Sequence, residues 1–491
     1  MLFTGCLPEL AAGPDGRLIA TGAAAREAAG RDAVVHELTG RALPGLTDSH
    51  LHLGWLAIEG LNCDLTGAPS LDAALARIRK HADRQPRRGW VIGRGWYNDA
   101  WKDTSFPDRH SLDDAVSGRP ALMTRKDGHS AWASSAALAA AGITRDSADP
   151  PGGVVDRDHD GEPTGIVREE AVGMVRRAIP PVADAAYDRG MLDALRRLRA
   201  LGLTSVHTMD GPLMFGSLQR LHSTGRLPVR VTWNLPAADL EHAERLGVRS
   251  GWGDEWLRIW GVKAFLDGSL GSRTAEMLDG SGVAVLPQPD LVDLVTRVAR
   301  AEMNVCLHAI GDGAVRRALD ALQPLAGAWR TWRPRIEHVQ VVDPADLPRF
   351  AALGVIASMQ PIHAVADREL ADRYWPGRGA DAYPWASLER SGARLAFGSD
   401  APVESADPIA GIEAATTWRH AVDWHPELAV SPASALRAYT AGAAYAVGLE
   451  RDLGSLRPGR LCDATVVEHH EGRVRVMATI VGGRLSRRPR R

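Results

Sequence analysis

The chain has 491 residues, of which 45% are hydrophobic and 24% are charged, and its formal net charge is -2. This apolar content is sufficient for a large buried core and excludes a disordered chain. The balanced charge argues against nucleic acid or an anionic membrane surface as the partner. No apolar run reaches the roughly 18 residues that span a bilayer.

The cysteines and the amino terminus bear on the cellular compartment. Cys6, Cys63, Cys306 and Cys462 are scattered without a CxxC pair, which does not favour a disulfide scaffold or a cysteine zinc knuckle. The opening residues, MLFTGCLPEL, lack the basic segment and long apolar segment of a secretory signal. We therefore expect a reduced, cytoplasmic protein.

Both ends of the chain are expected to be rich in β-strands. Residues 1–43 contain short apolar pieces broken by Gly and Asp, and residues 463–468 and 474–481 have the same character. We predict that residues 1–43 and 455–491 together build one small β-sandwich domain. The basic residues 487–491 are expected to form a solvated tail.

Between these ends, apolar strand candidates alternate with helical patterns. The strand candidates cover residues 42–46, 121–124, 203–206, 257–262, 304–307, 335–337, 355–358 and 394–397, and helical patterns include 188–201, 290–302 and 314–322. Eight strand–helix units predict an α/β fold, a (β/α)8 TIM barrel over residues 44–454. Active sites of such barrels lie at the carboxyl ends of the strands.

Two intervals in the barrel region are longer than one helix needs, at about 53–120 and 130–201. They contain Trp90, Trp96, Trp101 and Trp132, and residues 152–165 (GGVVDRDHDGEPTG) are typical of a β-hairpin. We interpret these intervals as excursions that cap the mouth of the barrel.

The first chemical signal is His50-Leu-His52, which closes the apolar run of the first strand. Residues i and i+2 of a strand face the same side, so the two imidazoles can bind one metal ion. Two incidental histidines would give the same short pattern. The position of the pair at a strand end favours the metal site.

Further polar residues end later strands. His308 and His338 follow the fifth and sixth candidates, and Asp400 follows the eighth. Each alone also fits a hydrogen-bonded histidine, a helix cap or a turn residue. Together with His50 and His52 they would converge on one mouth. Imidazole and carboxylate ligands suit Zn, and also Mn, Fe or Ni.

Lys263 ends the fourth candidate strand, in the segment GVKAFLDG. A cation beside a metal cluster would be repelled, so the residue is either a salt-bridged lysine or a lysine carboxylated by CO2. The carboxylated form would be an anionic ligand that bridges two metals.

Longer motifs connect these residues to a known family. The segments PGLTDSHLHL (44–53), HAIGD (308–312), IEHVQ (336–340), SMQP (358–361) and GSDAPV (398–403) resemble the metal-dependent amidohydrolase superfamily. GRGWYNDAW (93–101), DGHSAWASSAAL (127–138) and DGSLGSRTA (267–275) make the chain similar to the YtcJ-like, amidohydrolase-3 branch. The resemblance covers nearly the whole chain and keeps the order of the motifs.

The resemblance implies a role for each candidate ligand. His50 and His52 would bind the more buried divalent metal with Asp400. Lys263, if carboxylated, would bridge to a second metal held by His308 and His338. Asp400 would also act as the general base on a metal-activated hydroxide. One or two ions per chain, most simply Zn, and a homodimer are implied.

Five other residues are candidates for contact with the substrate. His129 and His207 are expected to end the second and third barrel strands, and Arg273 and His363 lie on later loops. Trp96 could form a wall of the pocket, although it fits the core of an excursion equally well.

Together these features predict a metal-dependent amidohydrolase that cleaves a non-peptide C–N bond in a small amide or cyclic amide. A mononuclear deaminase of a ring amidine, with Lys263 unmodified, is the nearest alternative. A non-catalytic barrel that binds a ligand is the other. The chain has no GxSxG, P-loop or Rossmann glycine motif that would favour another chemistry.

Overall fold

The computed structural model describes residues 1–87, 89–329 and 331–487. The chain divides into two compact units, Met1–Leu56 with Met191–Arg491, and Ala57–Gly190. Residues 488–491 of the expected basic tail lie outside the described residues. No helix in the described part of the chain is both long and apolar enough to cross a membrane.

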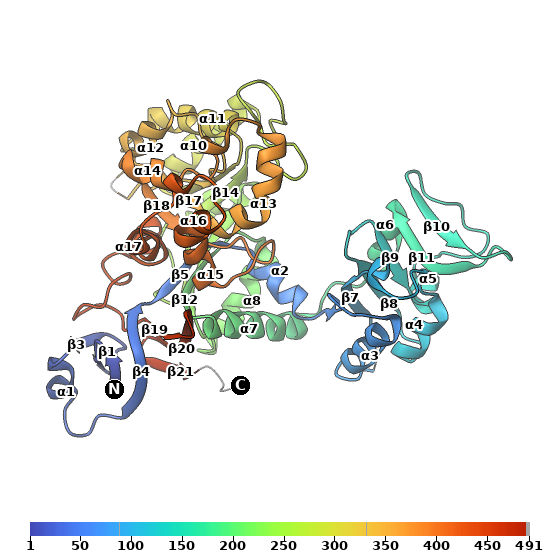
Figure 1. The fold of residues 1–491 in the computed structure, drawn as a ribbon, viewed down its shortest axis with the longest axis horizontal. Coiled ribbons are helices and arrows are strands. Elements are labelled where there is room, and N and C mark those ends of the chain that lie inside the picture. Colours follow the sequence, from blue (N-terminus) through green and yellow to red (C-terminus); the bar gives the residue numbers. More distant parts are fainter. Residues whose placement is uncertain (88, 330, 488–491) are drawn as a thin grey trace. The chain divides into compact units, whose positions relative to one another are not determined.

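Eight parallel strands form a nearly closed barrel in the first unit (Figure 1). In the order in which they neighbour one another, they are β5 (Leu46–Leu51), β12 (Leu203–Thr208), β13 (Arg230–Pro236), β14 (Leu257–Phe265), β15 (Asn304–Ala309), β16 (Arg335–His338), β17 (Ile356–Met359) and β18 (Arg394–Phe397). The backbone N–H of Asp400 donates to the carbonyl of His50 at 2.7 Å, which joins the end of β18 to β5. The predicted barrel is confirmed.

Helices connect and cover the barrel strands (Figure 1). They are α2 (Leu53–Glu59), α7 (Asp184–Ala200), α8 (Pro212–Ser223), α9 (Leu240–Leu246), α10 (Gln288–Arg300), α11 (Asp312–Leu322), α12 (Leu347–Leu353), α13 (Pro361–Tyr374), α14 (Trp385–Arg390), α15 (Pro408–Glu413), α16 (Arg419–Ala421), α17 (Pro432–Arg437) and α18 (Ala443–Ala446). In α10 the buried residues Leu291, Val295 and Val298 recur at helical spacing and form one apolar stripe. The three helical patterns predicted from the sequence correspond to α7, α10 and α11.

Two of the eight expected barrel strands are placed wrongly. Residues 42–44 belong to a strand of another sheet, Val35–Pro44, and the barrel strand β5 begins only at Leu46. Residues 121–124 form β8 (Ala121–Arg125), which belongs to a different sheet in the second unit. The missing barrel strand is β13, whose sequence RVTWNLP alternates polar and apolar residues although all but its last residue are buried. Its first residue, Arg230, donates from Nε to Asp463 Oδ2 at 2.8 Å, so a buried ion pair accounts for one of these polar residues.

The second unit has a six-stranded sheet of its own. It consists of β6 (Cys63–Asp64), β7 (Val91–Trp96), β8, β9 (Ser130–Ala133), β10 (Gly153–Arg157) and β11 (Pro163–Glu169), with helices α3 (Leu71–Ala82), α4 (Arg109–Val116), α5 (Ser135–Ala140) and α6 (Glu170–Arg177). Strands β10 and β11 pair antiparallel, so the hairpin expected in residues 152–165 is present. Ser70, Asp108 and Ser134 accept backbone hydrogen bonds at the starts of α3, α4 and α5.

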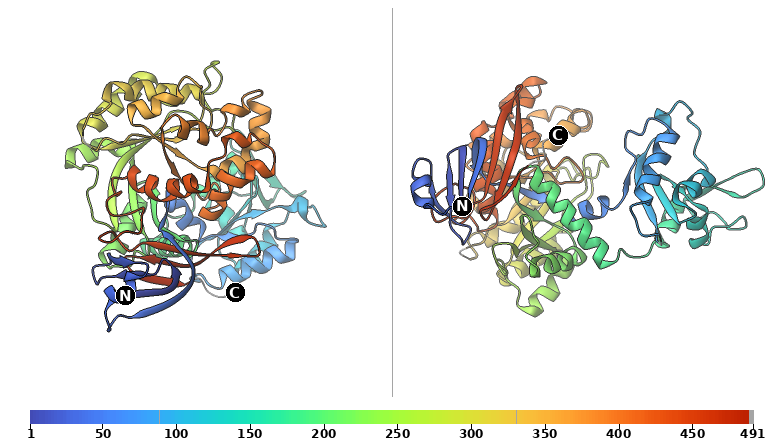
Figure 2. Two further views of the ribbon diagram at one scale, coloured as in Figure 1. Left: turned by 60° about the vertical axis from the view of Figure 1, so that its left-hand side comes forward. Right: turned by 90° about the horizontal axis from the view of Figure 1, so that it is seen from below.

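The two ends of the chain meet in a seven-stranded sheet, as predicted. Its order is β21 (Arg484–Arg487), β20 (Arg473–Val481), β19 (Ala464–His470), β4 (Val35–Pro44), β1 (Leu2–Leu7), β2 (Leu10–Ala12) and β3 (Leu18–Thr21), and α1 (Ala24–Ala29) follows β3. Phe3, Leu18, Val466 and Ile480 belong to one buried cluster. Figure 2 shows the blue N-terminal strands beside the red C-terminal strands.

Candidate metal centre

His50 is the most enclosed of the histidines at the carboxyl ends of the barrel strands. Strand β5 carries it into the interior, where its side chain has no exposure to solvent. Its Nδ1 lies 2.7 Å from Oε2 of Glu337. Its Nε2 has no hydrogen-bond partner and faces Oδ1 of Asp400 at 3.4 Å. A neutral imidazole that donates through Nδ1 presents a free lone pair at Nε2.

His52, two residues further along the chain, also has a carboxylate beside each of its ring nitrogens. Its Nδ1 lies 3.2 Å from Oδ1 of Asp210, and its Nε2 lies 3.1 Å from Oδ1 of Asp400. The ring stacks on Trp55 with the centroids 4.5 Å apart. Asp210 also accepts hydrogen bonds from the N–H of Gly54 at 2.8 Å and the hydroxyl of Thr208 at 2.9 Å, which fixes its carboxylate.

Asp400 lies just beyond β18 and faces both imidazoles. Its φ of 61° lies in the left-handed region, which a residue with a side chain seldom adopts. Such backbone strain is concentrated at functional sites. The hydrogen bond from its own N–H to the carbonyl of His50 holds this conformation.

Three further histidines surround the same carboxylate region. The ring of His338 lies 4.9 Å from that of His50 and 4.4 Å from that of His308, measured between centroids. His363, in the first turn of α13, has its Nε2 3.6 Å from Oδ2 of Asp400. These side chains come from β15, β16 and the start of α13, so several strands deliver ligand-type atoms to one place.

Lys263 lies on β14 and is 2% exposed. Its Nζ has no hydrogen-bond partner and lies 4.8 Å from the centroid of the Phe265 ring. Burial lowers the pKa of this amine. A buried amine without a partner is costly as an ammonium ion and is more reactive when neutral.

The pKa values of His50 and His308 favour neutral rings. Burial, and next the ammonium of Lys263, lower the pKa of His50 to about 4 and that of His308 to about 3. Burial likewise holds the pKa of His338 well below its usual range. At neutral pH these imidazoles are therefore uncharged, which is the state that binds a metal.

His52 and Asp400 are shifted in the opposite sense, as a charged pair. Burial lowers the pKa of His52, but its hydrogen bonds with Asp210 and Asp400 outweigh burial and raise it to about 9. Burial raises the pKa of Asp400, yet the hydrogen bond from His52 and the surrounding imidazoles hold it well below its usual range. Without a cation, a proton on His52 supplies the positive charge that balances the carboxylate.

The donor set fits a divalent metal ion. His50, His52 and Asp400 bring their ligand atoms within 4.8 Å of one another, and so do His338, His363 and Asp400. All five side chains are buried, and the Nε2 atoms of His50 and His363 lack hydrogen-bond partners. Buried polar atoms without partners are uncommon in folded proteins, and a cation would satisfy them.

The structure thus brings the six expected ligands into the barrel interior, and of the five expected substrate contacts it places only His363 against them. His207 is 1% exposed, and its Nδ1 lies 3.2 Å from the guanidinium of Arg335. Arg273 is exposed on the loop after β14, with its guanidinium carbon 5.6 Å from the centroid of the Tyr374 ring. His363 lies against Asp400, as described above.

The remaining two candidates belong to the second unit. Trp96 is buried in that unit's core, and its indole N–H donates to the carbonyl of Met123 at 2.7 Å. His129 was expected to end a barrel strand, which is wrong because β8 is not in the barrel. It lies between β8 and β9 with 69% of its side chain exposed, and its Nδ1 is 3.0 Å from Glu169.

Two carboxylates of the site were not identified from the sequence. Glu337 precedes His338 in the IEHVQ motif, and Asp210 follows the end of β12. Both support a histidine of the HxH pair through its outer nitrogen, an arrangement found around metal ligands generally. For both Glu337 and Asp210, the only indication in the sequence is an acidic residue at the end of a barrel strand.

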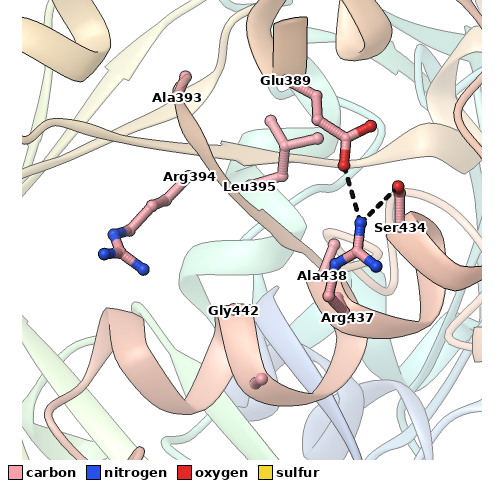
Figure 3. Close-up of a pocket in the computed structure, with 9 residues that line it drawn as sticks. Glu389, Ala393, Arg394, Leu395, Ser434, Arg437, Ala438 and Gly442 are labelled. Atoms are coloured by element: carbon pink, nitrogen blue, oxygen red, sulfur yellow. Dashed lines mark hydrogen bonds and ion pairs between the residues drawn. The ribbon is translucent and has the colours of Figure 1, made fainter.

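The opposite end of the barrel carries a separate surface pocket of about 210 Å³ (Figure 3). It lies at the amino end of β18, where Arg437 donates to Glu389 at 3.1 Å and to Ser434 at 2.7 Å. Since Asp400 follows the carboxyl end of the same strand, this pocket is not part of the metal centre.

A family profile and a related protein both connect the chain to amidohydrolases. A family profile described as the Amidohydrolase family matches residues 37–486. YtcJ of Bacillus subtilis, which is named as an amidohydrolase, is 30% identical over 446 residues, covering 86% of this chain and 83% of that protein.

Two further relatives extend the comparison. The N-substituted formamide deformylase of Arthrobacter pascens is 26% identical over 477 residues, covering 92% of this chain and 88% of that protein. A crystal structure of a metal-dependent hydrolase from Pyrococcus furiosus has 30% identity and a TM-score of 0.78, covering 96% of this chain and 98% of that one.

Proposed function

The chain belongs to the Amidohydrolase family, a family of metal-dependent hydrolases, and from this premise we propose that it hydrolyses a C–N bond other than a peptide bond. The proposed substrate is a small linear or cyclic amide. The observation that carries the proposal is the buried carboxylate of Asp400, with its Oδ1 3.4 Å and 3.1 Å from the Nε2 atoms of His50 and His52.

A divalent ion held by these three residues would supply a Lewis acid that polarises a carbonyl and makes water more acidic. Glu337 and Asp210 hold the two imidazoles in the orientation that presents Nε2. An ionised carboxylate has about four lone-pair positions, so Asp400 can be a ligand and still accept a proton.

Asp400 performs the proton transfers of the proposed reaction. Its lowered pKa keeps it ionised at neutral pH, so it can take the proton of the attacking water while the new C–O bond forms. It then returns that proton to the leaving nitrogen as the C–N bond breaks. Water is consumed, and the products are a carboxylic acid and an amine.

The bond type is supported by the names of two relatives, an amidohydrolase and an N-substituted formamide deformylase. N-substituted formamides therefore belong in the first substrate panel, beside linear and cyclic amides.

We also propose that the protein is a homodimer, that it is located in the cytoplasm, and that its substrate is a small molecule.

We also propose that the metal is zinc. A carboxylated Lys263 would supply, together with His308 and His338, the ligands for a second ion. The support is that Nζ of Lys263 is buried without a partner beside these histidines. Protein equilibrated with ¹³C-labelled CO2 should give a carbamate carbon signal that is absent from Lys263→Ala.

The decisive experiment compares wild-type protein with Asp400→Asn on the amide panel. We expect the variant to lose at least about 100-fold in kcat/KM, since general base catalysis alone contributes about 10²–10⁴-fold. Asp293→Asn, at a side chain that is 69% exposed, is the matched control and should keep full activity. Full activity in Asp400→Asn would refute the assignment.

The panel also separates the two alternatives. A mononuclear deaminase would leave the amides intact, release ammonia from a ring amidine and retain one metal per chain. A non-catalytic barrel would retain no metal and hydrolyse nothing. Either result would replace the proposed function.

A further inference from the structure

We infer that His363 is a metal ligand, which with His338 and Asp400 bounds a second cation position beside the one formed by His50, His52 and Asp400. The inference rests on the proposed metal-dependent function and deepens it. It changes the role expected for His363, from a residue that lines the substrate pocket to a ligand.

The first support is the distance between the atoms that would bind. Nε2 of His363 lies 3.6 Å from Oδ2 of Asp400, and the ligand atoms of His338, His363 and Asp400 all lie within 4.8 Å of one another. Three protein ligands with an open fourth place are the usual composition of a catalytic zinc site.

The second support is a set of buried atoms without partners. The side chain of His363 is 9% exposed, and its Nε2 has no hydrogen-bond partner. His338 is 4% exposed, and its Nδ1 also has none. Leaving such atoms unpaired in a protein interior is unfavourable, and a shared cation would satisfy them.

The third support is the group behind the ring of His363. The side-chain amide of Gln340 lies 3.3 Å from Nδ1 of His363, while Oε1 of the same amide has no partner. The oxygen and nitrogen of this amide exchange places when the group turns by half a rotation. With the amide turned over, Oε1 accepts the proton of Nδ1, and Nε2 is left with its lone pair toward Asp400.

Local structure fixes the ring in this place. Strand β17 ends at Met359, and Pro361 starts α13, so His363 lies in the first turn of the helix at the carboxyl end of a barrel strand. His363 and Ala364 are buried there. The position therefore does not depend on a long or mobile loop.

The proposed position also differs from the one built on Lys263. Nε2 of His308 lies 3.0 Å from the carbonyl oxygen of Gly268, so that nitrogen already has a partner in the backbone. The set of His338, His363 and Asp400 is complete without a modified lysine. Because His338 belongs to both sets, they are alternatives for one second ion, and the expected total remains two per chain.

The test is the metal content of His363→Asn. Wild-type and variant proteins are saturated with Zn²⁺, freed of unbound metal and analysed for zinc per chain, and Co²⁺ titrations followed by visible absorption give a second readout. We expect two equivalents in wild type and the loss of one in His363→Asn. The matched control is His159→Asn, whose side chain is 89% exposed, and it should keep both.

Two equivalents in a folded His363→Asn protein, or fewer than two in wild type, would overturn the inference. A second measurement does not depend on the folding of a variant: anomalous diffraction from wild-type crystals soaked in Zn²⁺ should place a zinc about 2.0–2.1 Å from Nε2 of His363. A zinc held by His338 but away from His363 would overturn it. Two bound zinc ions without hydrolysis of any amide would instead refute the proposed function and leave this inference standing.

Discussion

Nδ1 of His50 lies 2.7 Å from Oε2 of Glu337, and neither side chain has any exposure to solvent. The contact fixes which nitrogen of His50 carries the proton and directs Nε2 toward Asp400. Glu337 is held in turn by Arg335, whose Nε lies 2.9 Å from Oε1 of Glu337. The buried ion pair of Arg335 and Glu337 thus orients His50, the most buried ligand of the proposed metal centre.

Replacement of Glu337 by glutamine should weaken metal binding. The amide keeps the size of the side chain but loses the charge that supports His50, and loss of such an outer contact typically reduces affinity about 10–100-fold. Competition with a chromogenic chelator measures the change. Glu169→Gln, at a side chain that is 57% exposed, is the control and should leave affinity unaltered. Equal affinity in wild type and Glu337→Gln would show that the contact does not act on the metal.

Replacement of Arg335 by methionine should destabilise the fold. Arg335 and Glu337 are both 0% exposed, so the substitution leaves a buried carboxylate without its cation, at a cost of about 3–5 kcal/mol. Urea unfolding measures the loss. Arg196→Met breaks a pair whose side chains are 63% and 60% exposed, where about 0–1 kcal/mol is expected. Similar losses in the two variants would contradict the buried-pair account.

The metal-free protein should lose stability in mild acid, in part through His308. Burial and then Lys263 lower the pKa of His308 to about 3, whereas an unfolded histidine titrates near about 6.5. Its contribution to stability is therefore complete above pH about 6.5 and is lost as the pH falls toward about 3. The slope is at most about 1.4 kcal/mol per pH unit.

Urea unfolding of chelator-treated protein in CO2-free buffer at pH 7 and pH 5 measures this dependence. His308→Gln removes the titrating group, so the variant should lose less stability between the two values than wild type loses. His159→Gln, on the surface, should follow wild type. The same loss in His308→Gln as in wild type would assign the acid sensitivity to other groups.

Much of the barrel could be predicted from the sequence because its strands are buried on both faces. Continuous apolar runs that end in a polar residue identify six of the eight strands, and the run at 42–46 overlaps a seventh, β5, only at Leu46. Strand β13 was missed because Arg230, Thr232 and Asn234 interrupt its apolar pattern although all three are buried. The partner that makes Arg230 tolerable is Asp463, which is 233 residues away in the chain.

The candidate ligands could be found for a different reason. Each lies in the last residues of a barrel strand or just beyond its end, and the closure of the barrel brings strand ends together whatever the exact register. Glu337 and Asp210 could not be found this way, because their roles depend on which residue of a distant strand lies opposite them. His129 was misplaced because β8 looks like a barrel strand in sequence, while its neighbours β7 and β9 place it in another sheet.

The central claim is that His50, His52 and Asp400 hold a divalent metal. The most direct test is the metal content of wild-type protein purified without chelator or added metal, measured by elemental analysis beside Asp400→Asn. The account predicts at least one equivalent per chain in wild type and a marked loss in the variant. A wild-type protein that contains no metal, and takes up none after incubation with Zn²⁺, would contradict it.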